Sequence, residues 1–183
     1  QPVVLVTALG SDAAGQRVRE MLDEHVTVVD LGTDRTIVKT RVRSRGRTLI
    51  RMDDESIGQP SKPARDVDLD ALFSTASAVL VSDYGLGVSG RAAVRWALQD
   101  QPRIVWDPHP RGAVPVPGVT TVTPNAAEAA HFSEVAADHV TGAIRQGHEL
   151  LRRWRATSVT VTRGAAGAVR VNADVTPLVA PAP

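Results

Sequence analysis

Polar side chains follow four apolar runs of this sequence, in each case at the point where the run ends. The four endings are Ser82-Asp83, Asp107-Pro108, Thr123-Pro124-Asn125 and Thr162-Arg163-Gly164. One such ending is ordinary strand termination, since Asp, Asn, Pro and Gly commonly stop strands. Ligands of open parallel sheets bind beyond the carboxyl ends of the strands, so the recurrence of these endings favours a polar ligand site.

The segment Asn125-Ala126-Ala127-Glu128 has two interpretations. As structure, Asn125 caps a helix and Glu128 completes a capping box. As chemistry, a carboxylate at a helix N-terminus beside a phosphate can hold a hydrated Mg²⁺ ion. The four residues taken alone favour the cap. The turn Thr162-Arg163-Gly164 also has two interpretations. A glycine turn after a strand can let a nucleotide approach the backbone, or it can simply connect the strands of a hairpin.

A run of arginines is the second group of residues that could do chemistry. Its members are Arg41, Arg43, Arg45, Arg47 and Arg51. Guanidinium groups match the geometry of phosphate, so one interpretation is a site for an anionic group. The other is the solvated face of a hairpin, and composition alone favours it.

The elements that carry these residues follow from the hydrophobic pattern. Apolar runs predict strands at residues 3–6, 26–29, 78–81, 103–106, 119–122, 158–161 and 168–171. Helical spacing predicts a helix that begins after Gly10 and two more over about residues 90–99 and 138–155. Strands alternating with helices predict a parallel sheet. The proline-rich tail, residues 177–183, predicts no regular structure.

Residues 36–53 follow a different pattern, in which residue types alternate along two extended runs. Ser44-Arg45-Gly46 separates the runs, so the segment predicts an antiparallel ribbon around a glycine turn, with one basic and one moderately apolar face. An isolated hairpin is marginal in water. The ribbon therefore needs a partner surface, either a site that it covers or a second subunit.

Composition narrows the class of protein. The 183 residues are 43% hydrophobic and 22% charged, which suits a folded α/β domain. The net charge of +1 provides no general basic field, so we expect no nucleic-acid partner. The sequence has no cysteine and no apolar run long enough to span a bilayer. Its first residues, Gln1-Pro2-Val3-Val4, do not have the pattern of a signal peptide. We therefore expect a cytoplasmic protein without a membrane partner. No Walker A, Gly-x-Gly-x-x-Gly or Gly-x-Ser-x-Gly sequence occurs.

In order and spacing, segments along the chain resemble the ribokinase-like (PfkB) carbohydrate kinases. The segments are LGSDAAG at 9–15, TIVKTR at 36–41, LIRMD at 49–53, VSDYGLGV at 81–88, WDP at 106–108, VTPNAAE at 122–128 and VTRG at 161–164. Within that family they look most like the D-glycero-β-D-manno-heptose-7-phosphate kinases, often the kinase half of a bifunctional ADP-heptose synthase. The resemblance covers nearly the whole chain.

The resemblance implies a fold and an activity. The fold is α/β, a ribokinase-like mostly parallel sheet with flanking helices and a small antiparallel lid at about residues 35–54, all within one partial kinase domain over residues 1–183. The activity is ATP-dependent phosphoryl transfer to a sugar hydroxyl, with ATP as co-substrate, Mg²⁺ as cofactor and a heptose phosphate as acceptor, for ADP-heptose biosynthesis. Such lids commonly build a homodimer.

The resemblance also implies roles for residues of this sequence. The nucleotide-binding residues would be Asn125, Glu128, Thr162, Arg163 and Gly164, with Glu128 acting on the metal. The candidates for the acceptor site are Lys39, Arg41, Asp53, Asp83 and Asp107. In this assignment the capping geometry of Asn125 and Glu128 is compatible with their function.

The sequence departs from the family pattern in three places. The family's Gly-Ala-Gly-Asp motif, whose Asp is the catalytic base, and its amino-terminal sugar-binding segment do not occur in these residues. We therefore expect a fragment that is inactive alone, with the base beyond Pro183 and no catalytic residue within the chain. Leu86 and His109 occupy positions that are usually basic in heptose kinases, which leaves the exact sugar open. The alternative hypothesis is a non-catalytic module that binds a sugar phosphate or a nucleotide, or that serves assembly.

Overall fold

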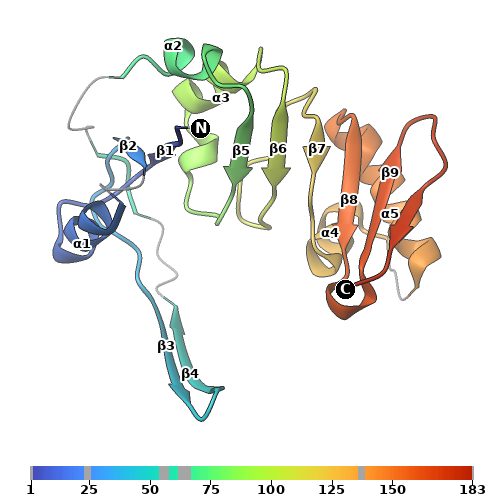
Figure 1. Ribbon diagram of the computed structural model, residues 1–183, viewed down its shortest axis with the longest axis horizontal. Helices are drawn as coiled ribbons and strands as arrows, with labels where there is room; N and C mark the ends of the chain where they lie inside the picture. The colour runs from blue at the N-terminus through green and yellow to red at the C-terminus, as the bar shows by residue number, and fades with distance from the viewer. Residues whose placement is uncertain (1, 23–25, 54–57, 62–66, 136–138, 183) are drawn as a thin grey trace. The chain divides into compact units, whose positions relative to one another are not determined.

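A computed structural model of the protein describes residues 2–22, 26–53, 58–61, 67–135 and 139–182. The chain divides into two compact units, Gln1–Val67 and Asp68–Pro183, and each is described by itself (Figure 1). None of the helices in the described ranges is both long and apolar enough to cross a bilayer.

The first unit begins with two strands and the helix between them. They are β1 (Val4–Thr7), α1 (Ala13–Leu22) and β2 (Thr27–Asp30). β1 and β2 are parallel, with Val4 opposite Thr27, which confirms the predicted parallel pair. The helix starts after Asp12, whose carboxylate accepts a hydrogen bond from the Gly15 N–H group, because the first N–H groups of a helix have no partner within it.

The predicted ribbon is present in the same unit as an antiparallel pair of strands. They are β3 (Lys39–Ser44) and β4 (Arg47–Asp53). Arg45 and Gly46 connect them, with positive φ angles of 47° and 78°. Two consecutive residues with positive φ form the tight hairpin turn whose twist matches the flanking strands, and glycine adopts that conformation without steric cost.

The register of the ribbon separates the two faces that the alternation predicts. Arg41 lies opposite Arg51, and both lie on the face that begins with Lys39. Val42 lies opposite Ile50 on the other face. Both of these apolar side chains are about half exposed, so this face still has apolar surface to bury.

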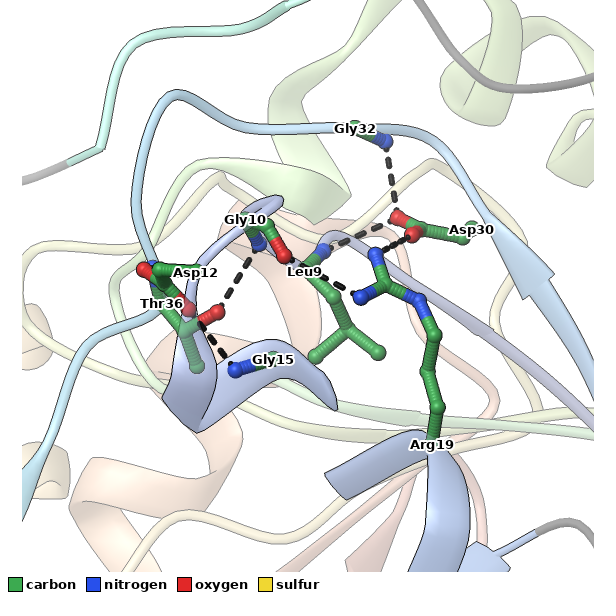
Figure 2. A network of polar contacts seen from close by, with 8 residues as sticks. All are labelled: Leu9, Gly10, Asp12, Gly15, Arg19, Asp30, Gly32 and Thr36. Atoms are coloured by element: carbon green, nitrogen blue, oxygen red, sulfur yellow. Dashed lines mark hydrogen bonds and ion pairs between the residues drawn. The ribbon is translucent and has the colours of Figure 1, made fainter. Parts of the chain in front are cut away.

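The carboxylate of Asp30 links β2 to α1 in the first unit (Figure 2). Asp30, the last residue of β2, pairs with Arg19 of α1 at 2.5 Å and accepts hydrogen bonds from the N–H groups of Leu9 and Gly32, each at 2.9 Å. Burial acts to raise the pKa of Asp30. The hydrogen bond from Arg19 and the two backbone donors outweigh burial and hold that pKa below its ordinary value.

The lowered pKa of Asp30 makes the stability of the protein depend on pH in a defined direction. The folded protein binds a proton at Asp30 less readily than the unfolded chain does. The carboxylate therefore stabilises the fold fully above the ordinary aspartate pKa of about 3.9, and this stabilisation is lost as the pH falls through the lower folded value. We expect Asp30→Asn to reduce the free energy of unfolding at pH 7, with the difference from wild type closing below about pH 4.

Urea unfolding measured at several pH values checks this expectation. Asp100→Asn is the matched control, because Asp100 lies at an exposed position shortly after the helix Ala92–Leu98. A difference between wild type and Asp30→Asn that stays constant from pH 7 to pH 3 would contradict the role of the ionised carboxylate.

The second unit is built on a six-stranded sheet in the order β10-β9-β8-β7-β6-β5 (Figure 1). The strands are β5 (Val79–Ser82), β6 (Ile104–Asp107), β7 (Thr121–Val122), β8 (Ser158–Thr162), β9 (Ala168–Asn172) and β10 (Leu178–Ala180). β5 to β8 are parallel, and the last two pairings are antiparallel. The sheet is therefore mostly parallel, as predicted.

The prediction that the tail is irregular was wrong for Leu178–Ala180, which form β10. This short strand pairs with β9 at the edge of the sheet, with Val179 opposite Val169. Prolines restrict strands chiefly by removing a donor from the ladder, and here Pro177 and Pro181 flank the three paired residues without interrupting them. Proline content alone therefore did not reveal the edge pairing of these three residues.

Helices flank the strands of this sheet (Figure 1). They are α2 (Leu69–Ser74), α3 (Ala92–Leu98), α4 (Ala126–Ser133) and α5 (Val140–Trp154). α5 packs against β8 and β9, and a Cβ atom at Gly147 would lie 2.7 Å from Val171, so glycine permits the close approach. Burial alternates along β6, where Trp106 is fully buried and Asp107 is exposed. The strand-end polar residues can therefore lie on the exposed face.

Candidate functional site

A cavity of about 500 Å³ opens at the carboxyl ends of four neighbouring strands of the second unit. Its lining residues are Leu80, Ser82, Asp107, Thr123, Asn125, Glu128 and Thr162. All of them except Leu80 carry a side-chain oxygen. The cavity is therefore surrounded by groups that bind cations and polar ligands.

Parallel pairing explains why residues distant in sequence meet at this cavity. Ser82, the last residue of β5, lies opposite Asp107, the last residue of β6. The Thr123 hydroxyl donates a hydrogen bond to Asp107 at 3.2 Å, and Asn125 forms a parallel bridge with Thr162 at the end of β8. The strand endings of the sequence thus converge at one edge of the sheet.

The capping box at the start of α4 is complete. The Asn125 side chain accepts hydrogen bonds from the N–H groups of Ala127 and Glu128, at 2.9 and 3.0 Å. The Glu128 carboxylate accepts one from the Asn125 N–H group at 2.8 Å through Oε2. The same carboxylate lines the cavity, so the cap and a ligand-binding role occur together in one residue.

The donor set of the cavity suits a hard divalent cation. Carboxylate, hydroxyl and amide oxygens are the ligands that Mg²⁺ prefers, and Mg²⁺ commonly keeps several waters with only one or two protein carboxylates. Glu128 and Asp107 are the two carboxylates of the cavity. Among the described residues no three His, Asp or Glu side chains converge, so an ion here would depend on these two, on water and on ligand oxygens.

The turn after β8 begins next to Thr162, which lines the cavity. Arg163 and Gly164 follow Thr162 directly but do not line the cavity. Gly164 has a φ of 56°, and a Cβ atom built on it would meet nothing within 4 Å. This backbone therefore has open space beside it, and its nucleotide-binding role stays a prediction.

Asp83 occupies a different environment from the other strand-end residues. It is 8% exposed, and its carboxylate accepts hydrogen bonds from the Gly85 N–H group at 2.7 Å, the Ala113 N–H group at 3.1 Å and the Ser89 hydroxyl. A Cβ atom on Gly112 would lie 2.3 Å from this carboxylate. Asp83 thus joins the loops that follow β5 and β6 and does not line the cavity.

The remaining acceptor-site candidates belong to the first unit. Lys39 and Arg41 are exposed on the basic face of the ribbon. Asp53 ends β4, and its side chain lies outside the described residues. Their roles at an acceptor site stay predictions.

Leu80, the apolar member of the cavity, was not predicted as a site residue. It is 69% exposed, although its run of apolar neighbours is typical of a buried strand. The signal that could have identified it is the two-residue period of a strand, which puts Leu80 on the same face as Ser82.

Comparisons with known proteins agree with this architecture. All of residues 1–183 match the family model described as pfkB family carbohydrate kinase. A protein named Bifunctional protein HldE from Streptomyces coelicolor is 40% identical over 99% of this chain, and one of the same name from Rhodospirillum rubrum is 32% identical over 97%. The chain spans 39% and 38% of the length of these two relatives.

Solved structures share the fold. A ribokinase from Giardia lamblia matches with a TM-score of 0.69 at 18% identity, over 96% of this chain and 57% of that one. Phosphofructokinase-2 from Escherichia coli, in complex with fructose-6-phosphate, matches with a TM-score of 0.63 at 16% identity, over 100% of this chain and 63% of that one. From the family match and the 40% identity, the chain belongs to the pfkB family of carbohydrate kinases.

Proposed function

We propose that this chain forms part of an ATP-dependent kinase that phosphorylates a hydroxyl group of a heptose phosphate. The observation that carries the proposal is the cavity of about 500 Å³, where Glu128 and Asp107 lie beside the first turn of α4. Residues that approach ATP phosphates in this proposal are Asn125, Glu128, Thr162, Arg163 and Gly164.

The cavity is better suited to bind phosphate through a cation than through hydrogen bonds from the backbone N–H groups of α4. The positive end of the α4 dipole favours anions near Asn125. Two N–H groups of that first turn are already bonded to the Asn125 side chain, so they are occupied by the cap. The predicted metal residue Glu128 would hold hydrated Mg²⁺, which when bound neutralises charge on the transferred phosphoryl group. Asp107, which the resemblance assigns to the acceptor, lines the same cavity and in this proposal also contributes an oxygen to the hydrated ion.

The ribbon supports a phosphorylated acceptor. Arg41 and Arg51 lie directly opposite each other on the basic face of the ribbon, so two guanidinium groups belong to the same part of that face. The planar guanidinium fork binds phosphate oxygens in pairs. The choice of a heptose as the sugar rests on the sequence resemblance and on the similarity to proteins named HldE.

A homodimer through the ribbon is part of the same proposal. Val42 and Ile50 form an apolar face that is about half exposed, and a two-stranded ribbon gains stability when such a face is covered. Location in the cytoplasm and the placement of all 183 residues in one kinase domain also stay predictions.

A phosphoryl-transfer assay on the complete gene product tests the proposal. We expect ADP to form only when ATP, Mg²⁺ and a sugar phosphate are all present, with D-glycero-β-D-manno-heptose 7-phosphate preferred over fructose 6-phosphate and ribose. Phosphorus-31 NMR would identify the new phosphate ester. ATP binding by calorimetry without turnover on any sugar would instead favour the non-catalytic binding module.

A further inference from the structure

Within the first unit, the ribbon is flanked in sequence by two chain segments, residues 33–36 and 58–60, which we call its base. The Asp34 N–H group donates to the Gln59 carbonyl at 2.9 Å, and the Gln59 N–H group donates to the Asp34 carboxylate at 2.7 Å. Thr33 forms an antiparallel bridge with Pro60. The outgoing and returning segments are thus bonded to each other where the ribbon begins.

One of these segments is also bonded to the loop that precedes α1, as Figure 2 shows. The Gly10 N–H group donates to the Thr36 hydroxyl at 2.8 Å, and the Thr36 N–H group donates to the Asp12 carboxylate at 2.7 Å. The other oxygen of Asp12 accepts from the Gly15 N–H group at 2.7 Å. We call Asp12 and Thr36 with these bonds the clasp.

Glycines allow the segments of the clasp to approach closely. A Cβ atom on Gly10 would lie 2.7 Å from the Arg35 Cα and from the Thr36 nitrogen. A Cβ atom on Gly15 would lie 2.1 Å from the Gly10 carbonyl oxygen and 2.8 Å from the Thr36 hydroxyl. Arg19 adds a hydrogen bond to the same carbonyl at 3.1 Å, so the loop is held from α1 as well.

We propose that the clasp between Asp12 and Thr36 positions the ribbon, and with it Lys39 and Arg41, for the acceptor. Thr36 precedes the first residue of β3 by three positions, a reach of about 10 Å at most. Because a two-stranded ribbon has little stability of its own, its orientation depends on its base. The proposal rests on the proposed function, in which this ribbon covers the acceptor.

Thr36→Val tests the clasp in the complete gene product, because it keeps the shape of the side chain and removes the acceptor of the Gly10 N–H group. We expect faster hydrogen exchange in residues 36–53 and a KM for the sugar phosphate about 10-fold higher, with the KM for ATP unchanged. Thr36→Ser keeps the hydroxyl and should restore both measurements. Thr48→Val, at an exposed position near the turn of the ribbon, is the matched control.

The outcomes separate the clasp from the proposed function. Unchanged exchange in residues 36–53 for Thr36→Val would overturn the clasp. Faster exchange with an unchanged sugar KM would overturn the placement of the ribbon at the acceptor. A wild-type protein that transfers no phosphate would overturn the proposed function, and the exchange measurements would still decide whether the clasp holds the ribbon.

Discussion

Glu128→Gln is expected to lower kcat/KM for phosphoryl transfer about 100-fold while leaving the stability of the protein unchanged. Glutamine at this position of a capping box still accepts the hydrogen bond from the Asn125 N–H group, which is 2.8 Å long in the structure. The substitution therefore removes the negative charge and preserves the cap. A 100-fold loss corresponds to about 2.7 kcal/mol, which is within the range expected when a cation that stabilises the transition state is held less well.

Two further variants complete this experiment. Glu128→Ala removes the charge and the hydrogen bond from the Asn125 N–H group but leaves the Asn125 cap, so it should add a stability loss of about 1 kcal/mol to the kinetic effect. Glu149→Gln is the matched control, because Glu149 pairs with Arg152 on the exposed side of α5 and such surface pairs contribute little. Steady-state kinetics at varied Mg²⁺ and thermal unfolding measure both effects. Wild-type kinetics and an unchanged Mg²⁺ requirement in Glu128→Gln would show that Glu128 is only a cap.

Asp83→Ala is expected to lower stability and Asp107→Ala to lower activity, although both residues stand at the carboxyl end of an apolar strand. Asp83→Ala should lower the free energy of unfolding by about 3 kcal/mol, because the backbone donors Gly85 and Ala113 and the Ser89 hydroxyl lose a buried acceptor. Asp107→Ala should change stability by less than about 0.5 kcal/mol, since its side chain is exposed. The same variant should lose about 10-fold or more in kcat/KM because it removes a carboxylate from the cavity.

Urea unfolding followed by tryptophan fluorescence, to which the buried Trp106 and Trp154 contribute, measures the stability of both variants. Asp83→Asn separates shape from charge, because an amide keeps one acceptor oxygen and should lose less stability than alanine. If Asp83→Ala kept its unfolding midpoint and lost sugar binding instead, Asp83 would belong to the acceptor site, as the resemblance implies. A large loss of stability in Asp107→Ala would contradict its placement on an exposed cavity wall.

Much of the fold could be predicted because its signals are local. Apolar runs marked the parallel strands of the second unit to within two residues, and strand alternation separated the basic and apolar faces of the ribbon. The capping box was also readable from four consecutive residues, and the structure confirms it. These features depend on side-chain periodicity and on hydrogen bonds between residues within one turn of helix or one hairpin.

Contacts between distant residues decided the rest. Asp83 and Asp107 look equivalent along the sequence, yet Ala113, thirty residues further on, donates to Asp83 and helps to bury it. Thr36 is bonded to Gly10 at a separation of 26 residues. Edge pairing made a strand of the tail at Leu178–Ala180. Such partners depend on how the chain closes, which a local pattern does not specify.

The four polar strand endings show the same division. By itself the sequence determined that Asp, Asn and Thr would stand at the carboxyl ends of parallel strands, because hydrophobic runs and their terminators are local properties. Only the tertiary structure decided which of them share the cavity. Asp107, Glu128 and Thr162 line the cavity, because the pairing of the parallel strands aligns their carboxyl ends. Asp83 is buried instead, because its carboxylate accepts hydrogen bonds from the loops that follow β5 and β6.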